Sequence, residues 1–168
     1  MRAFISFGSN LGDRRENILD SLRRLHHVSG IAVKKISPVY ETAAEGFLRP
    51  APSFLNGAAE LESACSVRDL LGMLLDIERQ IGRIRLPSAD YQSRLIDLDL
   101  LLFGDEILQQ PDLIVPHPRM LQRWFVLRPL TDLAPGVRIP GAGISVQEAL
   151  ENLGPYPRPS GFLLEENL

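Results

Sequence analysis

Two aspartates, Asp97 and Asp99, lie one residue apart inside one of the most apolar runs of the chain, residues 94–103. A strand rises about 3.3 Å per residue and its side chains alternate between faces, so both carboxylates project to the same side, roughly 6.6 Å apart along the backbone. Two carboxylates in this arrangement can share a pair of divalent metal ions. The alternative is a half-solvated strand end whose polar face carries Asp twice, and spacing alone leaves both interpretations open.

The residues around the pair indicate a central strand. The face of the aspartates continues as Leu101 and Phe103, and the opposite face is apolar throughout: Ile96, Leu98, Leu100 and Leu102. An ionised carboxylate removed from water in such surroundings costs several kcal/mol unless something compensates its charge. A divalent cation is the simplest compensation.

Basic residues gather on both sides of the aspartates although the chain is acidic overall. Three arginines of the loop that begins at Gly82 lie between Glu78 and the pair, Arg83, Arg85 and Arg94, and a second group follows the pair: His117, Arg119 and Arg123. Arginine binds phosphate through two parallel hydrogen bonds and keeps its charge near neutral pH. Together with carboxylate-bound Mg²⁺, these residues are typical of phosphoryl-type transfer, whereas arginines scattered over a solvated face are the alternative. No Gly-x4-Gly-Lys-Ser/Thr loop is present in the sequence.

Aromatic and amide side chains suggest a site for a flat acceptor. Phe54 and Asn56 share one strand face, and Phe125 follows Arg123 by two residues. Two rings can sandwich a heterocycle while an amide reads its edge, although each ring alone also fits a core position. Glu78 lies along the apolar stripe of its helix and either joins the site or reaches solvent at the edge of that stripe.

The composition limits the number of domains, the class of partner and the cellular location that we expect. The chain has 168 residues, 45% of them hydrophobic and 23% charged, which predicts a single domain over residues 1–168. A formal net charge of -3 at pH 7 argues against nucleic acid as the main partner. One cysteine, Cys65, fits a reducing compartment, and we expect a cytoplasmic monomer with no signal peptide and no membrane-spanning segment.

Periodicity and capping signals predict the elements that position these residues. An opening strand runs to Gly8, and a helix follows Asp13. A second strand spans 31–42, and a loop at 43–53 precedes a third strand at 54–62. A helix capped by Ser66 ends at Gly82, and the aspartate strand follows. After a proline-rich segment around 111–118, a short helix is expected near 146–153, and the tail 154–168 is expected to wrap or to be loosely ordered. This order predicts an α+β, ferredoxin-like βαββαβ sandwich, with helices on one face of an antiparallel sheet.

Taken in order, these stretches closely resemble the 6-hydroxymethyl-7,8-dihydropterin pyrophosphokinase family of folate biosynthesis. The similarity covers roughly residues 4–135 and comprises Gly8-Ser9-Asn10-Leu11-Gly12-Asp13, Ser37-Pro38-Val39-Tyr40-Glu41-Thr42, Phe54-Leu55-Asn56, Glu78 with Gly82-Arg83-Ile84-Arg85, Arg94 with Asp97-Leu98-Asp99, Pro116-His117-Pro118-Arg119 and Arg123-Trp124-Phe125-Val126-Leu127.

The resemblance implies that ATP gives its β,γ-diphosphate to the hydroxymethyl oxygen of a reduced pterin alcohol, leaving AMP. It implies two Mg²⁺ ions on Asp97 and Asp99. ATP would be held or activated by Glu78, Arg83, Arg85, Arg94, His117 and Arg123, of which Arg83 and Arg94 join the two aspartates as catalytic residues. The pterin pocket would comprise Thr42, acting mainly through its backbone, with Gly46, Phe54, Asn56 and Phe125.

Two segments depart from the family pattern. A proline commonly follows the threonine where this chain has Ala43-Ala44-Glu45-Gly46, and an aromatic residue followed by Gly-Pro is common where it has Tyr91-Gln92-Ser93. These departures leave a second hypothesis, a catalytically impaired relative that still binds ATP or pterin. A third is a non-catalytic ferredoxin-like module that binds RNA or a regulatory nucleotide.

Overall fold

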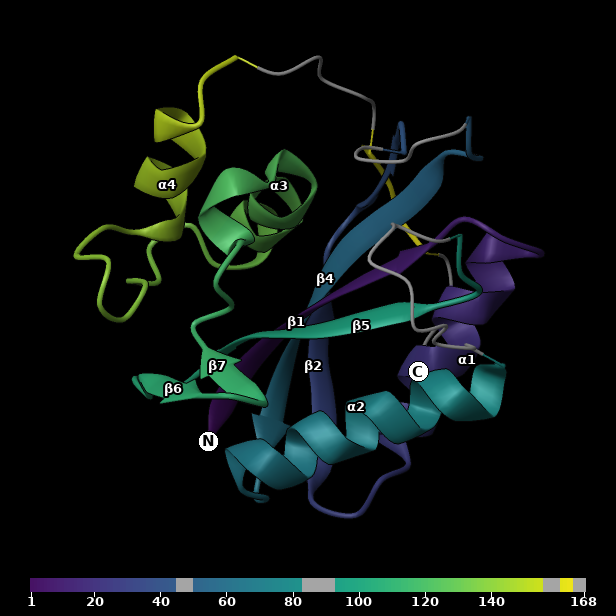
Figure 1. The fold of residues 1–168 in the computed structure, drawn as a ribbon, viewed down its shortest axis with the longest axis horizontal. Coiled ribbons are helices and arrows are strands. Elements are labelled where there is room, and N and C mark those ends of the chain that lie inside the picture. The colour runs from purple at the N-terminus through teal and green to yellow at the C-terminus, as the bar shows by residue number, and fades with distance from the viewer. Residues whose placement is uncertain (45–49, 83–92, 156–160, 165–168) are drawn as a thin grey trace.

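The computed structural model describes residues 1–44, 50–82, 93–155 and 161–164 (Figure 1). Arg83, Arg85 and Gly46, which the sequence assigns to the site, lie outside the described residues. The elements run in the order β1 (Arg2–Ser9), α1 (Arg14–His26), β2 (Ile31–Ile36), β3 (Val39–Thr42), β4 (Phe54–Ser63), α2 (Val67–Ile81), β5 (Asp97–Phe103), β6 (Leu108–Gln110), β7 (Leu113–Val115), a 3₁₀ turn (Met120–Gln122), α3 (Trp124–Leu133), α4 (Val146–Asn152) and β8 (Gly161–Phe162).

The main sheet is antiparallel in every pairing and has the order β5-β1-β4-β3, with the short strand β8 beyond β3. β2 and β3 both pair with β4, at its two ends, so they act as one interrupted strand. The single strand expected over 31–42 is therefore broken at Ser37 and Pro38, because proline cannot donate to the ladder. With β2 and β3 counted together, the order is that of the ferredoxin-like fold, and the expected fold class is confirmed.

Side-chain caps mark the first residues of α1 and α2 at the positions that the sequence predicts. Asp13 accepts a hydrogen bond from the Glu16 amide at 3.0 Å, and the Ser66 side chain accepts from the Asp69 amide at 3.2 Å. These bonds satisfy amides that the first helical turn leaves without partners. Gly82 ends α2 with a φ of 104°, a left-handed conformation that glycine adopts at low cost.

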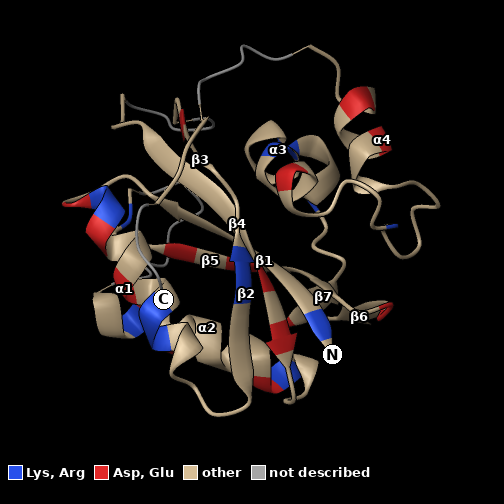
Figure 2. Cartoon of the chain, turned by 180° about the vertical axis from the view of Figure 1, so that it is seen from behind, with Lys and Arg blue, Asp and Glu red and all other residues tan. Residues whose placement is uncertain are grey.

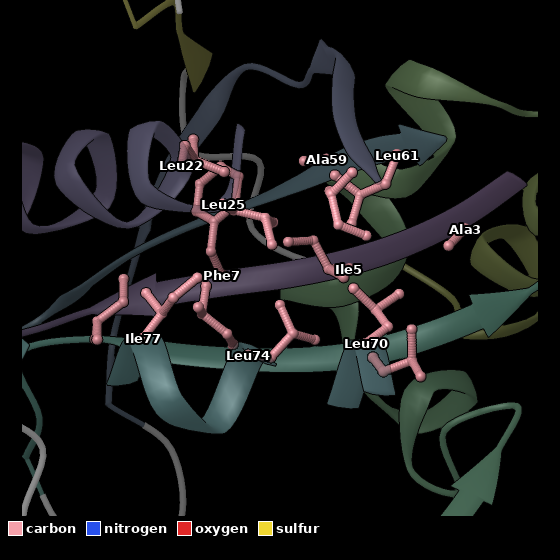
Figure 3. Close-up of a cluster of buried hydrophobic side chains, with 14 of the residues drawn as sticks. Ala3, Ile5, Phe7, Leu22, Leu25, Ala59, Leu61, Leu70, Leu74 and Ile77 are labelled. Carbon is pink, nitrogen blue, oxygen red and sulfur yellow. The ribbon is translucent and has the colours of Figure 1, made fainter. Parts of the chain in front are cut away.

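Helices cover both faces of the sheet (Figure 1). On one face, Ile5 and Phe7 of β1 pack with leucines of α1 and α2, among them Leu22 and Leu74 (Figure 3). On the other face, Phe4, Ala58 and Leu101 pack against α3 and α4, mainly through Val126, Leu127, Leu130, Val146 and Ala149. The expectation of helices on one face was therefore incomplete, because α3 was not predicted.

A β-bulge in β5 changes which side chains face each core. The pairing with β1 shifts between Phe4 and Ile5, which lie opposite Leu102 and Leu100, so Leu101 is the extra residue. As a result, Leu101 and Leu102 both belong to the core under α3 and α4, whereas Phe103 belongs to the core under α1 and α2. Strict alternation along the strand predicts for each of Leu102 and Phe103 the face opposite to the one it occupies. Alternation holds only up to Leu101.

A small hairpin and a short C-terminal strand add to the main elements. The proline-rich segment forms the hairpin β6–β7, which Arg68 of α2 ties down by donating to Asp112 at 2.7 Å. In the C-terminal tail, Gly161 and Phe162 of β8 pair with β3, so these residues extend the sheet rather than fray. Within the described ranges, no helix has the length and apolar character needed to cross a membrane.

Candidate active site

Among the described strands, β5 lies at the edge of the main sheet beside β1, so the expectation of a central strand for the two aspartates was wrong. Asp97 lies opposite Gly8 and Asp99 opposite Ser6 on β1 (Figure 2, acidic segment of β5 in red). Their side chains remain 23% and 34% exposed. Both precede the bulge and share the face of Leu101, so they project toward the side on which α3 lies. They therefore occupy a part of that face that is open to ligands.

Two arginines and a histidine face the carboxylates. Arg94 Nη1 donates to Asp97 Oδ2 at 2.6 Å, and Arg123 Nη1 lies 3.8 Å from Asp99 Oδ2. His117 Nε2 lies 4.0 Å from the same Asp99 oxygen. All three basic side chains are at most 16% exposed. Segments distant in sequence thus converge on the acidic pair, as the clustering of basic residues suggested.

His117 is neutral at physiological pH. Burial, together with the nearby Arg123 and Arg119 cations, lowers the pKa of His117 to about 4. Its Nδ1 accepts a hydrogen bond from the Arg119 amide at 3.2 Å, which places the ring proton on Nε2. The Nε2–H therefore points toward Asp99 and is available as a donor at the site.

Glu78 is buried in the structure, with 1% of its surface exposed. Its Oε1 accepts a hydrogen bond from the Leu98 amide at 2.7 Å. Leu98 separates the two aspartates, so this contact from α2 holds the backbone between them. The possibility that Glu78 reaches solvent is thereby excluded. Its assignment to ATP stays a prediction.

On the same sheet face, Thr42 and Asn56 form a polar pair at the other side of β1. Asn56 Nδ2 donates to Thr42 Oγ1 at 2.8 Å, and both residues are at most 8% exposed. Asn56 lies opposite Gly8, and a Cβ at Gly8 would be only 2.6 Å from Asn56 Oδ1. Position 8 therefore has no room for a side chain. The Gly8 backbone forms the surface of the site between Asn56 and Asp97.

Both predicted aromatic residues carry an arginine above the ring. The Arg94 guanidinium carbon lies 6.0 Å from the centre of Phe54, and that of Arg123 lies 5.5 Å from the centre of Phe125. Neither ring is fully buried. The same two arginines therefore face a carboxylate and an aromatic ring, and they link the acidic pair to the aromatic part of the site.

Asn10 is a residue of this region to which the sequence assigned no individual role. It is 2% exposed, and its Oδ1 accepts from the Arg94 amide at 2.7 Å. Its Nδ2 donates to the Pro52 carbonyl at 3.2 Å and to Ser93 Oγ at 3.0 Å. Asn10 thus fixes the backbone of Arg94 and joins it to the segment before Phe54. The polar Gly8-Ser9-Asn10 ending of an apolar strand was the available signal.

A pocket of about 260 Å³ opens next to the acidic pair. It is lined by Asp99 and Leu100 of β5, His117 and Pro118, Leu71 of α2, and the hairpin residues Pro111, Asp112, Leu113 and Ile114. No sequence pattern indicated this pocket, because it depends on how the hairpin folds back toward α2.

The acidic pair is better suited to Mg²⁺ than to a metal ion whose ligands all come from the protein. Among the residues that the structure describes, no group of three or more His, Cys, Asp or Glu side chains is placed to hold a metal ion. Two carboxylates with open space beside them leave positions for water and substrate phosphates, which is the usual way proteins bind Mg²⁺. The donor set therefore fits Mg²⁺ delivered with a polyphosphate.

Relatives with similar sequences are enzymes of folate synthesis by name. The chain is 40% identical over 151 residues to "Folic acid synthesis protein fol1" of Schizosaccharomyces pombe, covering 90% of this chain but 20% of that protein. It is 43% identical to "2-amino-4-hydroxy-6-hydroxymethyldihydropteridine pyrophosphokinase" of Pseudomonas aeruginosa, covering 83% of this chain and 84% of that protein. The protein of the same name in Bacillus subtilis is 40% identical, with 78% and 77% covered. The chain thus spans about a fifth of the fungal relative and most of the bacterial ones.

Solved structures share the fold at low sequence identity. A structure described as HPPK-DHPS in complex with substrates matches with a TM-score of 0.70 and 13% identity, covering 90% of this chain and 43% of that one. A Plasmodium falciparum HPPK-DHPS structure with pteroate also has a TM-score of 0.70, with 12% identity and coverage of 90% and 44%. The model of the 7,8-dihydro-6-hydroxymethylpterin-pyrophosphokinase (HPPK) family matches residues 4–135. With the sequence, the fold and this match in agreement, the chain belongs to the HPPK family.

Proposed function

We propose that this chain transfers the β,γ-diphosphate of ATP to the hydroxymethyl oxygen of 6-hydroxymethyl-7,8-dihydropterin, releasing AMP, in tetrahydrofolate biosynthesis. The observation that carries the proposal is the row of residues across β5, β1 and β4, where Asp97, Gly8 and Asn56 lie opposite one another. Strands in a sheet are about 4.8 Å apart, so roughly 10 Å separates the acidic and amide positions. This spacing suits two substrates bound side by side.

The amide end of the row is the proposed pterin site. A pterin is a flat heterocycle whose edge carries several hydrogen-bond donors and acceptors. Phe54 and Phe125 offer partly exposed faces for stacking, and Asn56 offers an amide whose Nδ2 is already oriented by Thr42. A buried, oriented amide discriminates well among substrates, because a poorly matched ligand leaves it without a partner.

The acidic end is the proposed triphosphate site. The adjoining pocket is large enough for a nucleotide base and lies next to Asp99, so the phosphates would run from that pocket along β5 toward Asn56. Asp97 and Asp99 would hold Mg²⁺, for which we propose two ions per site. Bound Mg²⁺ neutralises phosphate charge and orients the triphosphate.

The protein's own basic residues then position the chain of phosphates. Arg94 and Arg123 each lie within reach of a carboxylate, and with metal bound we expect them to contact phosphate oxygens instead. His117 is neutral and has its proton on Nε2, so it would donate to phosphate without adding charge. These contacts stabilise charge as it moves from the β-phosphorus to the leaving group.

In the proposed reaction the pterin hydroxymethyl oxygen forms a bond to the β-phosphorus and gives up its proton to solvent. The bond from that phosphorus to the oxygen shared with the α-phosphorus breaks, and AMP leaves. Catalysis would rest on aligning the two substrates and on neutralising charge. The proposed pterin and triphosphate sites share one rigid sheet face, which provides this alignment.

An assay for AMP release tests the function directly. With ATP, Mg²⁺ and the reduced pterin alcohol present, we expect AMP, and omission of any one component is expected to abolish it. Asp97→Asn and Asp99→Asn should lower turnover by orders of magnitude. Asp105→Asn is the matched control, because Asp105 is an exposed acid just beyond the other end of β5. AMP release without the pterin, or full activity in both site variants, would contradict the proposal.

The monomeric state, the cytoplasmic location and the number of metal ions stay predictions from the sequence. The roles assigned to Arg83, Arg85 and Gly46 are likewise predictions, since these residues lie outside the described ranges.

A further inference from the structure

A compact polar network joins the start of α1 to both sides of the segment between β3 and β4. Arg14 Nη1 donates to Glu41 Oε1 at 2.7 Å and to Ser53 twice, at 2.9 Å to its carbonyl and 2.9 Å to its Oγ. Ser53 Oγ in turn donates to Glu41 Oε1 at 2.5 Å. These bonds lower the pKa of Glu41, the Ser53 bond having the largest effect and the Arg14 bond the next. The carboxylate is therefore ionised at neutral pH. We call these three residues the Arg14 clamp.

The clamp sits directly beside the proposed pterin residues. Glu41 precedes Thr42 and Ser53 precedes Phe54, and Thr42 and Phe54 are opposite each other as the last pair of the β3–β4 ladder. A terminal ladder pair has a neighbouring pair on only one side, so it opens more easily than a pair inside the sheet. Glu41, opposite Leu55, lies on the inner side of that pair and Ser53 lies on its open side, so the clamp joins the two strands across the terminal pair.

The clamp side chains lie on the other side of the strand from the ligand face. Thr42 and Tyr40 share the face of Asn56, so Glu41 points the opposite way, toward α1. Arg14 is the first residue of α1, and 30% of its side chain is exposed, against 52% for Glu41. At such exposure a single ion pair adds little to the stability of the whole domain. Its effect is expected to be local to the end of the ladder.

We infer that Arg14 is a positioning residue for the acceptor substrate, because its clamp holds the Thr42–Phe54 pair in register and thereby shapes the pterin side of the site. This inference rests on the proposed function, in which those residues contact the pterin. It assigns to Arg14 an effect on pterin affinity, while nucleotide affinity depends on β5, the hairpin and α3. Arg14 itself contacts no substrate.

Arg14→Ala, with Arg15→Ala as control, tests the inference. Arg15 is the adjacent, exposed arginine of the same helix, so it matches the charge that is lost. We would measure the pterin Kd with Mg²⁺ and a non-hydrolysable ATP analogue, the Kd of that analogue alone, kcat, and the thermal unfolding midpoint. Arg14→Ala is expected to weaken pterin binding by about tenfold, the equivalent of about 1.4 kcal/mol and of one or two hydrogen bonds. The analogue Kd should change by less than about twofold.

Ser53→Ala provides a second variant that keeps the Arg14–Glu41 ion pair and removes only the Ser53 hydroxyl. It should weaken pterin binding by a smaller factor, and the double variant Arg14→Ala/Ser53→Ala should be no weaker than Arg14→Ala alone, since the residues act as one unit. If Arg14→Ala does not fold, the Ser53→Ala result decides. Arg14→Lys, which keeps charge but has one compact donor group, is expected to restore only part of the affinity.

Equal pterin affinity in the Arg14→Ala and Arg15→Ala variants would overturn the inference. So would a parallel loss of pterin and nucleotide affinity, which would indicate a general structural defect. A wild-type protein that neither binds the pterin nor releases AMP would instead overturn the proposed function, and the inference would fall with it. The wild-type measurement therefore separates the two failures.

Discussion

His117 is expected to make the ligand-free protein less stable in mild acid. In the unfolded chain its imidazole takes up a proton near pH 6.5, whereas burial and two nearby arginines delay this in the folded protein to about pH 4. Between these values the unfolded state binds more protons than the folded state. The free energy of unfolding therefore falls as pH falls from about 6.5 to about 4, and the contribution of His117 is constant outside that window.

The size of the effect follows from the shift. A lowering from 6.5 to about 4 corresponds to about 3 kcal/mol over the whole window, because one pKa unit equals about 1.4 kcal/mol. About 2 kcal/mol of this loss should be reached by about pH 5. His117 is 15% exposed at its side chain, so solvent screens the effect little.

Urea unfolding of wild type and His117→Asn at about pH 7 and about pH 5, with a chelator present, measures this contribution. The asparagine does not titrate, and its Oδ1 can take the place of Nδ1 as acceptor for the Arg119 amide. The drop in unfolding free energy between the two pH values should be about 2 kcal/mol smaller in the variant. His27→Asn, at the exposed histidine that caps the C-terminus of α1, supplies the baseline for removing one imidazole. An identical drop in wild type and His117→Asn would refute the reasoning.

Three further changes probe other parts of the structure. Glu78→Ala removes the acceptor of the buried Leu98 amide and should cost about 1.5–3 kcal/mol in urea unfolding; a loss no greater than that of Glu78→Gln, which keeps an acceptor oxygen, would contradict this account. Gly57→Ala places a Cβ 2.4 Å from the Phe7 ring and should destabilise by about 1–3 kcal/mol, which an unchanged melting temperature would disprove. Asn10→Asp keeps the acceptor oxygen but loses both side-chain donors, so AMP formation should fall while the circular dichroism spectrum is retained; wild-type turnover would show that these donors are dispensable.

The sequence predicts elements well where local chemistry determines them. The Asp13 and Ser66 caps, the stripe of α2 and its end at Gly82 are all formed as expected. α3 was missed because Pro129 lies inside it and no side chain caps its start. The bulge at Leu101 was also missed, since an uninterrupted apolar run contains no signal for an extra residue.

In the candidate site, too, the sequence predicts what local structure determines and misses what tertiary packing determines. Alternation along a strand is local, and it correctly places Asp97 and Asp99 on one face. Contacts that depend on tertiary packing were out of reach, among them the bond from Glu78 to Leu98 and the links from Asn10. A buried carboxylate can bind a ligand, a metal or a backbone amide, and only the fold decides which of these lies nearby.

The bulge in β5 restricts where the chain can change its length. Insertion of one more residue between Asp97 and Phe103 would turn either the acids or the leucines beyond them to the wrong side of the sheet, whereas loss of Leu101 would only restore regular alternation. The exposed turn that follows, around Asp105 and Glu106, has no such restriction. Insertions that accumulate as related chains diverge should therefore spare this strand and collect in the turn after it.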